Sequence, residues 1–296
     1  MGVSKRLLLI LNPISGKMAG KRHLADVLDA FCRADYLPTV CVTNRSGHAK
    51  EVACAHGGDA DLVVCLGGDG TFNEVVSGLL EGGHTTPMGY IPCGSTNDFA
   101  SAIGLKKNIA AATSAILEGT PHKYDVGLFG NRHFSYVASF GIFSRASYAT
   151  SQNVKNMLGH LAYVLEGAKE LFDIHPWHVK VEMEGQTVEG DYIFGAVSNS
   201  TSVGGVLTLD PHVVDMNDGL LELLLVKMPR NAVELSECVL ALAERRYDSK
   251  FITFLSGSSF QVTAEEEMEW SLDGEWGRGA ANLRIRNLKD AITLIH

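Results

Sequence analysis

The first 120 residues alternate short apolar runs with longer segments of mixed polarity. Runs of Leu, Val and Ile predict strands at residues 6–11, 39–43, 61–66 and 88–91. An uninterrupted apolar run is typical of a strand that is buried on both faces, and strands that alternate with helices form parallel βαβ units. The pattern therefore predicts a doubly wound α/β domain, a fold whose ligands bind beyond the carboxyl ends of the strands.

The pattern changes after Pro121, where apolar segments become separated by turn residues such as Gly130-Asn131. This spacing favours an antiparallel sheet or sandwich. We expect an α/β domain over residues 1–127 and a β-rich domain over residues 128–286, with the active site in the cleft between them. In the second domain the pattern predicts strands at residues 124–129, 133–140, 178–184, 188–198, 220–226 and 258–262, and helices at 154–172 and 232–245.

Composition narrows the class of protein. The 296 residues are 46% hydrophobic and 20% charged, which excludes general disorder. A net charge of −9 disfavours nucleic-acid binding through a basic face. Six cysteines without a CxxC pair indicate neither a zinc site nor a disulfide framework, and the apolar run at 7–11 is too short for a signal peptide or a membrane span. We expect a cytoplasmic protein.

The most informative segment is the glycine loop Gly67-Gly68-Asp69-Gly70-Thr71, which lies between a predicted buried strand and a predicted helix. Glycines at such a turn let the backbone approach a phosphate, and the first amides of the helix point at it. A carboxylate in a phosphate loop requires a divalent cation between the two anions, so Asp69 predicts Mg²⁺. The alternative is an ordinary tight turn, because Asp-Gly is a common turn pair.

Two further glycine turns follow predicted strands, at residues 12–16 and 93–100, whereas residues 16–21 do not complete a Walker A motif. The carboxyl ends of neighbouring parallel strands meet at one edge of a sheet, so we expect Asp69 and Asp98 to lie around one ligand. Ser95 or Thr96 would donate to a phosphate oxygen or cap the following helix.

Taken together, these motifs resemble the diacylglycerol kinase catalytic-domain family, most closely its bacterial soluble lipid kinases. The resemblance covers nearly the whole chain and extends to Gly204-Gly205, Asp218-Gly219 and Asp273-Gly274-Glu275. It implies an ATP site in the first domain and phosphate transfer to a lipid hydroxyl. It also implies a final strand near residues 291–295, which returns the segment 287–296 to the first domain.

The resemblance also implies roles for individual residues. The carboxylates of Asp69, Asp98 and Asp125 correspond to those around the catalytic Mg²⁺ and its waters, although Asp125 could instead occupy a surface turn. Residues that correspond to the family's ATP contacts are Asn12, Thr43, Gly67, Gly68, Asp69, Gly70, Thr71, Phe72, Asn73 and Ser95.

Glu275 is similar to the general base of the family. A lipid hydroxyl is a poor nucleophile, and a positioned carboxylate can accept its proton as the bond to phosphorus forms. The resemblance implies a second, structural cation site formed by Asp215, Asp218 and the Leu220 carbonyl, for which a plain turn is the alternative. Many members have Arg at the position of Ser101, where it would contact a phosphate or a lipid headgroup. The resemblance therefore defines the identity of the acceptor lipid less closely than it defines the fold.

The predicted function is that of an ATP-dependent lipid kinase acting on diacylglycerol or a related lipid, taken from a membrane surface by transient peripheral contact. The apolar stripe of the helix predicted at 154–172 is either core or lipid groove. Two alternatives stay open: a kinase of a soluble acceptor, similar to NAD kinase or phosphofructokinase, and a catalytically silent nucleotide- or lipid-binding module. The natural lipid and the oligomeric state are also open, with a homodimer as one option.

Overall fold

The computed structural model describes residues 4–141, 175–203, 207–210, 214–264 and 268–296. The chain divides into two compact units. Unit 1 comprises Met1–Val126 and Asp290–His296, and unit 2 comprises Gly127–Lys289. The predicted helix at 154–172 and the Gly204-Gly205 pair lie outside the described residues.

Unit 1 is built on a parallel sheet with the strand order β17-β4-β3-β1-β2. The predicted doubly wound fold is confirmed, and β1 and β3 are buried nearly throughout because both faces of the sheet are covered. The strands are β1 (Lys5–Leu11), β2 (Tyr36–Val42), β3 (Leu62–Gly67), β4 (Met88–Pro92) and the end of β17 (Asn282–Ile295).

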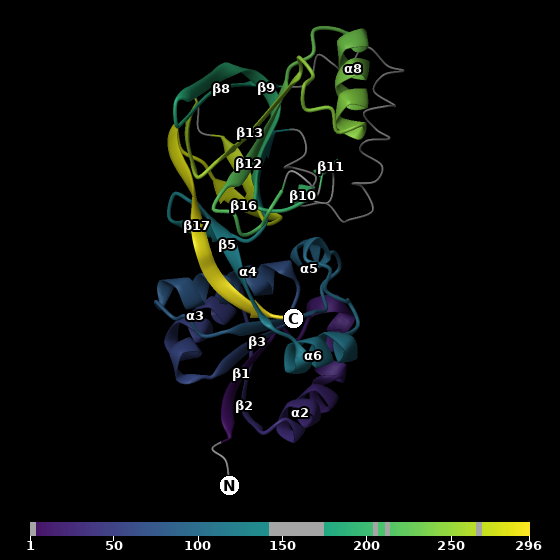
Figure 1. Cartoon of the computed structure of the whole chain (residues 1–296), viewed down its shortest axis with the longest axis vertical. Helices are drawn as coiled ribbons and strands as arrows, with labels where there is room; N and C mark the ends of the chain where they lie inside the picture. Colours follow the sequence, from purple (N-terminus) through teal and green to yellow (C-terminus); the bar gives the residue numbers. More distant parts are fainter. Residues whose placement is uncertain (1–3, 142–174, 204–206, 211–213, 265–267) are drawn as a thin grey trace. The chain divides into compact units, whose positions relative to one another are not determined.

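Helices cover both faces of this sheet (Figure 1). On one face Leu7, Leu9 and Leu11 of β1 pack with Phe31 of α2 and Ile116 of α6. On the other face α3 contacts β1, α4 contacts β3, and the two helices pack against each other. The helices are α1 (Ala19–Arg22), α2 (Leu24–Arg33), α3 (His48–His56), α4 (Asp69–Glu81), α5 (Asp98–Ala102) and α6 (Ile109–Glu118), with 3-10 turns η1 (Ser15–Met18) and η2 (Gly57–Asp59).

Unit 2 is an antiparallel sheet with the order β16-β15-β7-β9-β8-β14-β17, and β12 joins it by pairing with β9 and β13. Its core surrounds Trp270, whose ring lies 4.9 Å from those of Phe129 and Phe140. The strands are β5 (Pro121–Phe129), which begins in unit 1, β6 (Arg132–Phe134), β7 (Val137–Gly141), β8 (Trp177–Met183), β9 (Gln186–Ser198), β10 (Ser202–Val203), β11 (Leu207–Thr208), β12 (Leu221–Lys227), β13 (Ile252–Gly257), β14 (Ser259–Ala264), β15 (Glu269–Leu272) and β16 (Glu275–Arg278), with helix α8 (Ala232–Ala243).

Two expectations for unit 2 need correction. The single strand predicted at 133–140 is two strands, β6 and β7, because the amides of Ser135 and Tyr136 between them donate to the Asp273 side chain instead of to a neighbouring strand. The apolar pattern also missed β13, β15 and β16. The last two contain four residues each, too few for a clear alternation.

The last strand, β17, contains 14 residues and is much longer than the resemblance implied. Its first part pairs with β14 in unit 2, and near its end Leu294 lies opposite Met88 of β4 in unit 1. Asp290, where the chain passes back into unit 1, has a positive φ of 53°. In the part of the chain that the structure describes, no helix is long and apolar enough to cross a membrane.

Candidate active site

Three glycine segments meet at the carboxyl edge of the parallel sheet, because β1, β3 and β4 are neighbours there. The Asn12 Nδ2 after β1 donates to the Thr71 Oγ1 at 3.0 Å, which ties the first turn to the second. The Cys93 amide after β4 donates to the Gly67 carbonyl of β3 at 2.8 Å. Segments separated by up to about 80 residues therefore form one continuous backbone surface.

The contacts between these segments leave no room for side chains. A Cβ atom on Gly94 would lie 2.7 Å from the Gly68 Cα, closer than real Cβ atoms approach a backbone. A Cβ atom on Gly16 would collide with the Cys93 carbonyl, and Gly16 has a positive φ of 53°. Glycine is needed at these places because the loops touch backbone to backbone.

Asp69 connects the two main loops directly. It is the first residue of α4, and its carboxylate accepts hydrogen bonds from the amides of Asp98 (3.1 Å) and Phe99 (3.4 Å) at the start of α5. Burial raises the pKa of the Asp69 carboxyl, and the amide hydrogen bonds offset only part of that effect. The idea that Ser95 or Thr96 caps α5 is wrong, since Asp69 takes this role from another part of the chain.

Not every residue predicted to bind the nucleotide offers a side chain to it. Phe72 is 0% exposed, its ring stacks 4.4 Å from that of Phe99, and its amide donates to the Gly68 carbonyl within the helix. The Phe72 side chain thus belongs to the core, and the place of Phe72 in the nucleotide-binding loop stays a prediction. Thr43 is buried at the end of β2, Asn73 is half-buried in α4, and Ser95 is exposed.

Two residues that sequence reasoning left without a role hold these loops. Asn97 is buried with a positive φ of 53°, and its side chain binds both the amide (2.8 Å) and the carbonyl (3.0 Å) of Gly94. Asn tolerates this left-handed conformation, so its position before a predicted helix was a usable signal. Glu74 accepts from the amides of Gly47 (2.7 Å) and Ala49 (3.1 Å), a long-range contact without a local sequence signal.

Asp125 lies within β5 and is 0% exposed, so the alternative of a surface turn is wrong. Its Oδ1 accepts from the Asp290 amide at 2.8 Å, at the point where β17 enters unit 1. The ring of its neighbour Tyr124 lies 5.9 Å from that of Phe99 in α5. β5 therefore contacts the helix that begins at the second glycine loop.

The remaining predicted site residues belong to unit 2. Glu275 is exposed and is the first residue of β16, directly after the turn formed by Asp273 and Gly274. In the turn before β12, the Asp218 Oδ1 accepts from the Leu220 amide at 2.8 Å, and the Leu220 carbonyl accepts from the Asn287 side chain at 3.1 Å. Asp215 is exposed and accepts from the Asn217 amide at 3.0 Å.

A buried acid lies close to this turn. Glu222 is 1% exposed, and its Oε2 has no hydrogen-bond partner. Burial, and then the negative charges of Asp218 and Asp215, raise the pKa of Glu222 to about 8. Within the described ranges, no group of three or more His, Cys, Asp or Glu side chains has the arrangement of a metal site.

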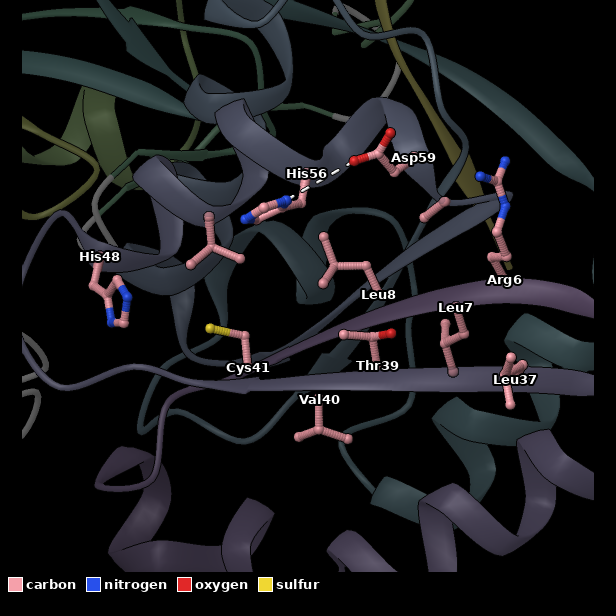
Figure 2. Close-up of a pocket in the computed structure, with 12 residues that line it drawn as sticks. Arg6, Leu7, Leu8, Leu37, Thr39, Val40, Cys41, His48, His56 and Asp59 are labelled. Atoms are coloured by element: carbon pink, nitrogen blue, oxygen red, sulfur yellow. Dashed lines mark ion pairs between the residues drawn. The ribbon is translucent and has the colours of Figure 1, made fainter.

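A pocket of about 680 Å³ lies in unit 1, beside the outer strand β2 and helix α3. Figure 2 shows the residues that line it. None of the predicted site residues lines it, and its polar groups include the pair of His56 and Asp59 at 3.9 Å. This pocket is separate from the glycine loops. Its lining includes Leu8, Thr39, Cys41, His48 and Val52.

A buried strand, a glycine loop and a helix that begins with a half-buried Asp form the arrangement that is typical of phosphate-binding α/β proteins. Comparison with known proteins specifies the class. The diacylglycerol kinase catalytic domain matches residues 6–129, and the YegS C-terminal NAD kinase beta sandwich-like domain matches residues 136–296. The chain belongs to the diacylglycerol kinase family, in its bacterial branch, and is a lipid kinase that uses ATP.

Individual relatives agree with this assignment. The chain is 34% identical to a diacylglycerol kinase of Bacillus subtilis over 278 residues, which cover 92% of this chain and 90% of the relative. It is 32% identical to a diacylglycerol kinase of Staphylococcus haemolyticus, with coverages of 95% and 85%. A solved Bacillus anthracis structure, provisionally described as a diacylglycerol kinase, has 25% identity, a TM-score of 0.80 and coverages of 100% and 98%.

The close contact of the two loops predicts the effect of Gly94→Ala. The new methyl group would push Gly68 and Gly94 apart, and a displacement of about 1 Å in a catalytic site can lower the rate about 10²-fold. We expect kcat/KM for ATP to fall on that order, measured by steady-state kinetics. Gly190→Ala is the control, because a Cβ atom there meets only ordinary contacts at 3.6 Å or more. Equal activity of the two variants would contradict the role of the close contact.

Proposed function

We propose that this protein transfers the γ-phosphate of ATP to the hydroxyl group of diacylglycerol or a closely related lipid. The main observation behind the proposal is that the Asp69 carboxylate, at the amino end of α4, accepts hydrogen bonds from the second glycine loop and so joins the two loops. The names of the relatives at 30 to 34% identity support diacylglycerol as the acceptor class.

The triphosphate would lie against the glycine loops. The first amides of α4, at Asp69, Gly70 and Thr71, have no carbonyl partner in their own helix, because those carbonyls would belong to the turn before it. The helix dipole favours an anion at the same end. Gly68 and Gly94, which touch backbone to backbone, would form part of the surface under the phosphates.

The donor set of unit 1 fits Mg²⁺, which prefers carboxylate oxygens. Asp69 carries a carboxylate that burial disfavours, so a cation beside it would restore the balance of charge. Asp69, Asp98 and Asp125 would surround the ion and hold it through its bound waters, because the described residues contain no group of three acids arranged to ligate a metal directly. When bound, Mg²⁺ supplies neutralisation of the phosphate charge during transfer.

Glu275 would act as the general base. Its exposed carboxylate accepts the proton of the lipid hydroxyl as the oxygen attacks the γ-phosphorus, and ADP leaves as the bond to the bridging oxygen breaks. The acceptor is a membrane lipid, so we propose transient contact of a cytoplasmic protein with a membrane surface. The proposal holds equally for a monomer and for a homodimer.

The direct test is incubation with Mg²⁺, γ-³²P-labelled ATP and one acceptor at a time: diacylglycerol, a sphingoid base and undecaprenol in mixed micelles, and NAD and fructose 6-phosphate in solution. Label in organic-extractable phosphatidic acid supports the proposal. Label only in NAD or the sugar phosphate would replace the lipid with a soluble acceptor. Absence of label from all products would indicate a binding module without turnover.

Asp69→Asn separates catalysis from stability. Removing the charge that faces the phosphates and the cation should lower kcat by about 10³-fold, as for other preorganised electrostatic groups. Burial makes the ionised Asp69 carboxylate unfavourable, but both of its oxygens accept from the amides of Asp98 and Phe99. The side-chain nitrogen of Asn would face one of these amides, where two donors cannot bond. Because the two effects oppose each other, we expect a Tm close to that of the wild type, measured by differential scanning calorimetry.

The control for Asp69→Asn is Asp26→Asn, because the Asp26 side chain is exposed on α2 and lies apart from the loops. Activity of Asp69→Asn within threefold of the wild type would remove Asp69 from the catalytic site. A strongly lowered Tm would contradict the electrostatic account.

Glu275→Gln keeps the shape of the side chain and removes its basicity. If Glu275 accepts the proton, kcat should fall by about 10² to 10⁴-fold while KM for ATP changes little. Glu269→Gln, the same substitution at the other end of the hairpin, is the matched control and should act like the wild type. A loss below about threefold in Glu275→Gln would exclude it as the base.

We also propose that Asp215, Asp218 and the Leu220 carbonyl bind a structural cation. Two exposed acids beside the buried, unpartnered Glu222 oxygen support a bound positive charge there. Mg²⁺ should then raise the Tm of the wild type, since a ligand that binds only the folded state stabilises it. Asp218→Asn should lower that rise, whereas Asp69→Asn should keep the part of the rise that comes from this site. An equal rise in Asp218→Asn would exclude this site.

A further inference from the structure

Glu275 is held at the tip of a tight hairpin. Asp273 and Gly274 form the two-residue turn between β15 and β16, and Leu272 lies opposite Glu275 as the pair that closes it. Both turn residues have positive φ angles, 50° and 85°, as in a type I′ turn. Asp273 is 5% exposed, whereas Glu275, two residues later, is exposed.

The Asp273 side chain points into unit 2, not into solvent. Its carboxylate accepts hydrogen bonds from three consecutive amides, those of Ser135 at 2.5 Å and of Tyr136 and Val137 at 3.0 Å each. The Asp273 amide donates in turn to the Val137 carbonyl at 2.9 Å. Four hydrogen bonds thus attach the hairpin tip to the segment between β6 and β7.

That segment is itself fixed. The Tyr136 carbonyl accepts from the Ser198 Oγ at 3.0 Å and from the Asn199 amide at 2.9 Å, at the end of β9. All of these residues are buried. The hairpin tip is therefore attached to a part of the sheet with little freedom to move.

The turn alone does not require this arrangement. An Asp-Gly pair forms a type I′ turn with its carboxylate in water, and burying a carboxylate is unfavourable unless several donors compensate it. Here three amides that could have continued a strand are used to bind one side chain. The structural effect is to fix the backbone from which Glu275 projects.

We propose that Asp273 is a positioning residue that fixes Glu275 for proton transfer through its contacts with the amides of Ser135, Tyr136 and Val137. This inference rests on the proposed role of Glu275 as the base. Proton transfer requires the base within hydrogen-bond reach of the acceptor hydroxyl, so a small displacement of the hairpin lowers the rate of the chemical step.

Asp273→Asn tests the inference without removing the turn, because Asn-Gly is at least as favourable as Asp-Gly in a type I′ turn. The amide nitrogen of Asn would face the Ser135 N–H, where two donors cannot bond, and the negative charge is lost. We expect kcat for lipid phosphorylation to fall by about 10²-fold, with KM for ATP within about twofold of the wild type. Asp191→Asn, an exposed site in unit 2, controls for the chemical change.

The double variant Asp273→Asn/Glu275→Gln distinguishes positioning from a general structural role. If Asp273 acts only through Glu275, the double variant should be no slower than Glu275→Gln alone, since residues that act as a unit are not additive. If instead the kcat losses of the two single variants multiply in the double variant, the inference is overturned. If far-UV circular dichroism shows that Asp273→Asn does not fold, Gly274→Ala is the second variant, because it strains the same turn at a φ of 85°. It should likewise lower kcat and leave KM for ATP nearly unchanged.

The results for the two single variants distinguish failure of the positioning role of Asp273 from failure of the proposed base role of Glu275. If Glu275→Gln retains full activity, the base assignment fails and the positioning role fails with it. If Glu275→Gln is inactive but Asp273→Asn has kcat within threefold of the wild type, only the positioning role is overturned.

Discussion

The contact between the Asp69 carboxylate and the amides of Asp98 and Phe99 is the interaction on which the candidate site depends. It joins the helix that follows β3 to the helix that follows β4, so the two glycine loops become one surface. Gly68 and Gly94 touch backbone to backbone in the same surface, and the hydrogen bond from Asn12 to Thr71 joins the first turn to it. The half-buried Asp69 carboxylate orders the backbone around it and, in the proposed function, also faces the cation and the phosphates.

The two units share one structural feature. In each, a carboxylate accepts hydrogen bonds from backbone amides in a distant part of the chain: the half-buried Asp69 in unit 1 and the buried Asp273 in unit 2. Hydrogen bonds to a charged group are stronger and more directional than those between neutral groups. Both carboxylates therefore fix loop geometry at positions where apolar packing would leave the backbone free to shift.

Local patterns account for what the sequence could predict. Continuous apolar runs identified β1, β3 and β4, and the glycine turns after them identified the edge of the sheet where the loops meet. Phe72 was not recognised as a core side chain because a motif does not say which face of a helix a residue occupies. Its spacing to Val75, Val76 and Leu79, three, four and seven residues on, was the signal for a core position.

Other features had no local signal. The amides that bind Asp273 lie 136 to 138 residues away along the chain, so the sequence showed only an ordinary hairpin turn. The burial of Asp125 likewise depends on β17, which reaches it from the other end of the chain. Contacts of this kind follow from topology and not from residue pattern.

Hydrogen exchange with and without Mg²⁺ and a non-hydrolysable ATP analogue reports on the backbone amides of the glycine loops themselves. If the loops bind the triphosphate, nucleotide binding should slow exchange in the three segments that meet at the edge of the sheet: residues 12–18, 67–72 and 93–99. Unchanged exchange in these segments, or protection confined to the pocket beside β2 at Tyr36–Val42, would contradict triphosphate binding by these loops.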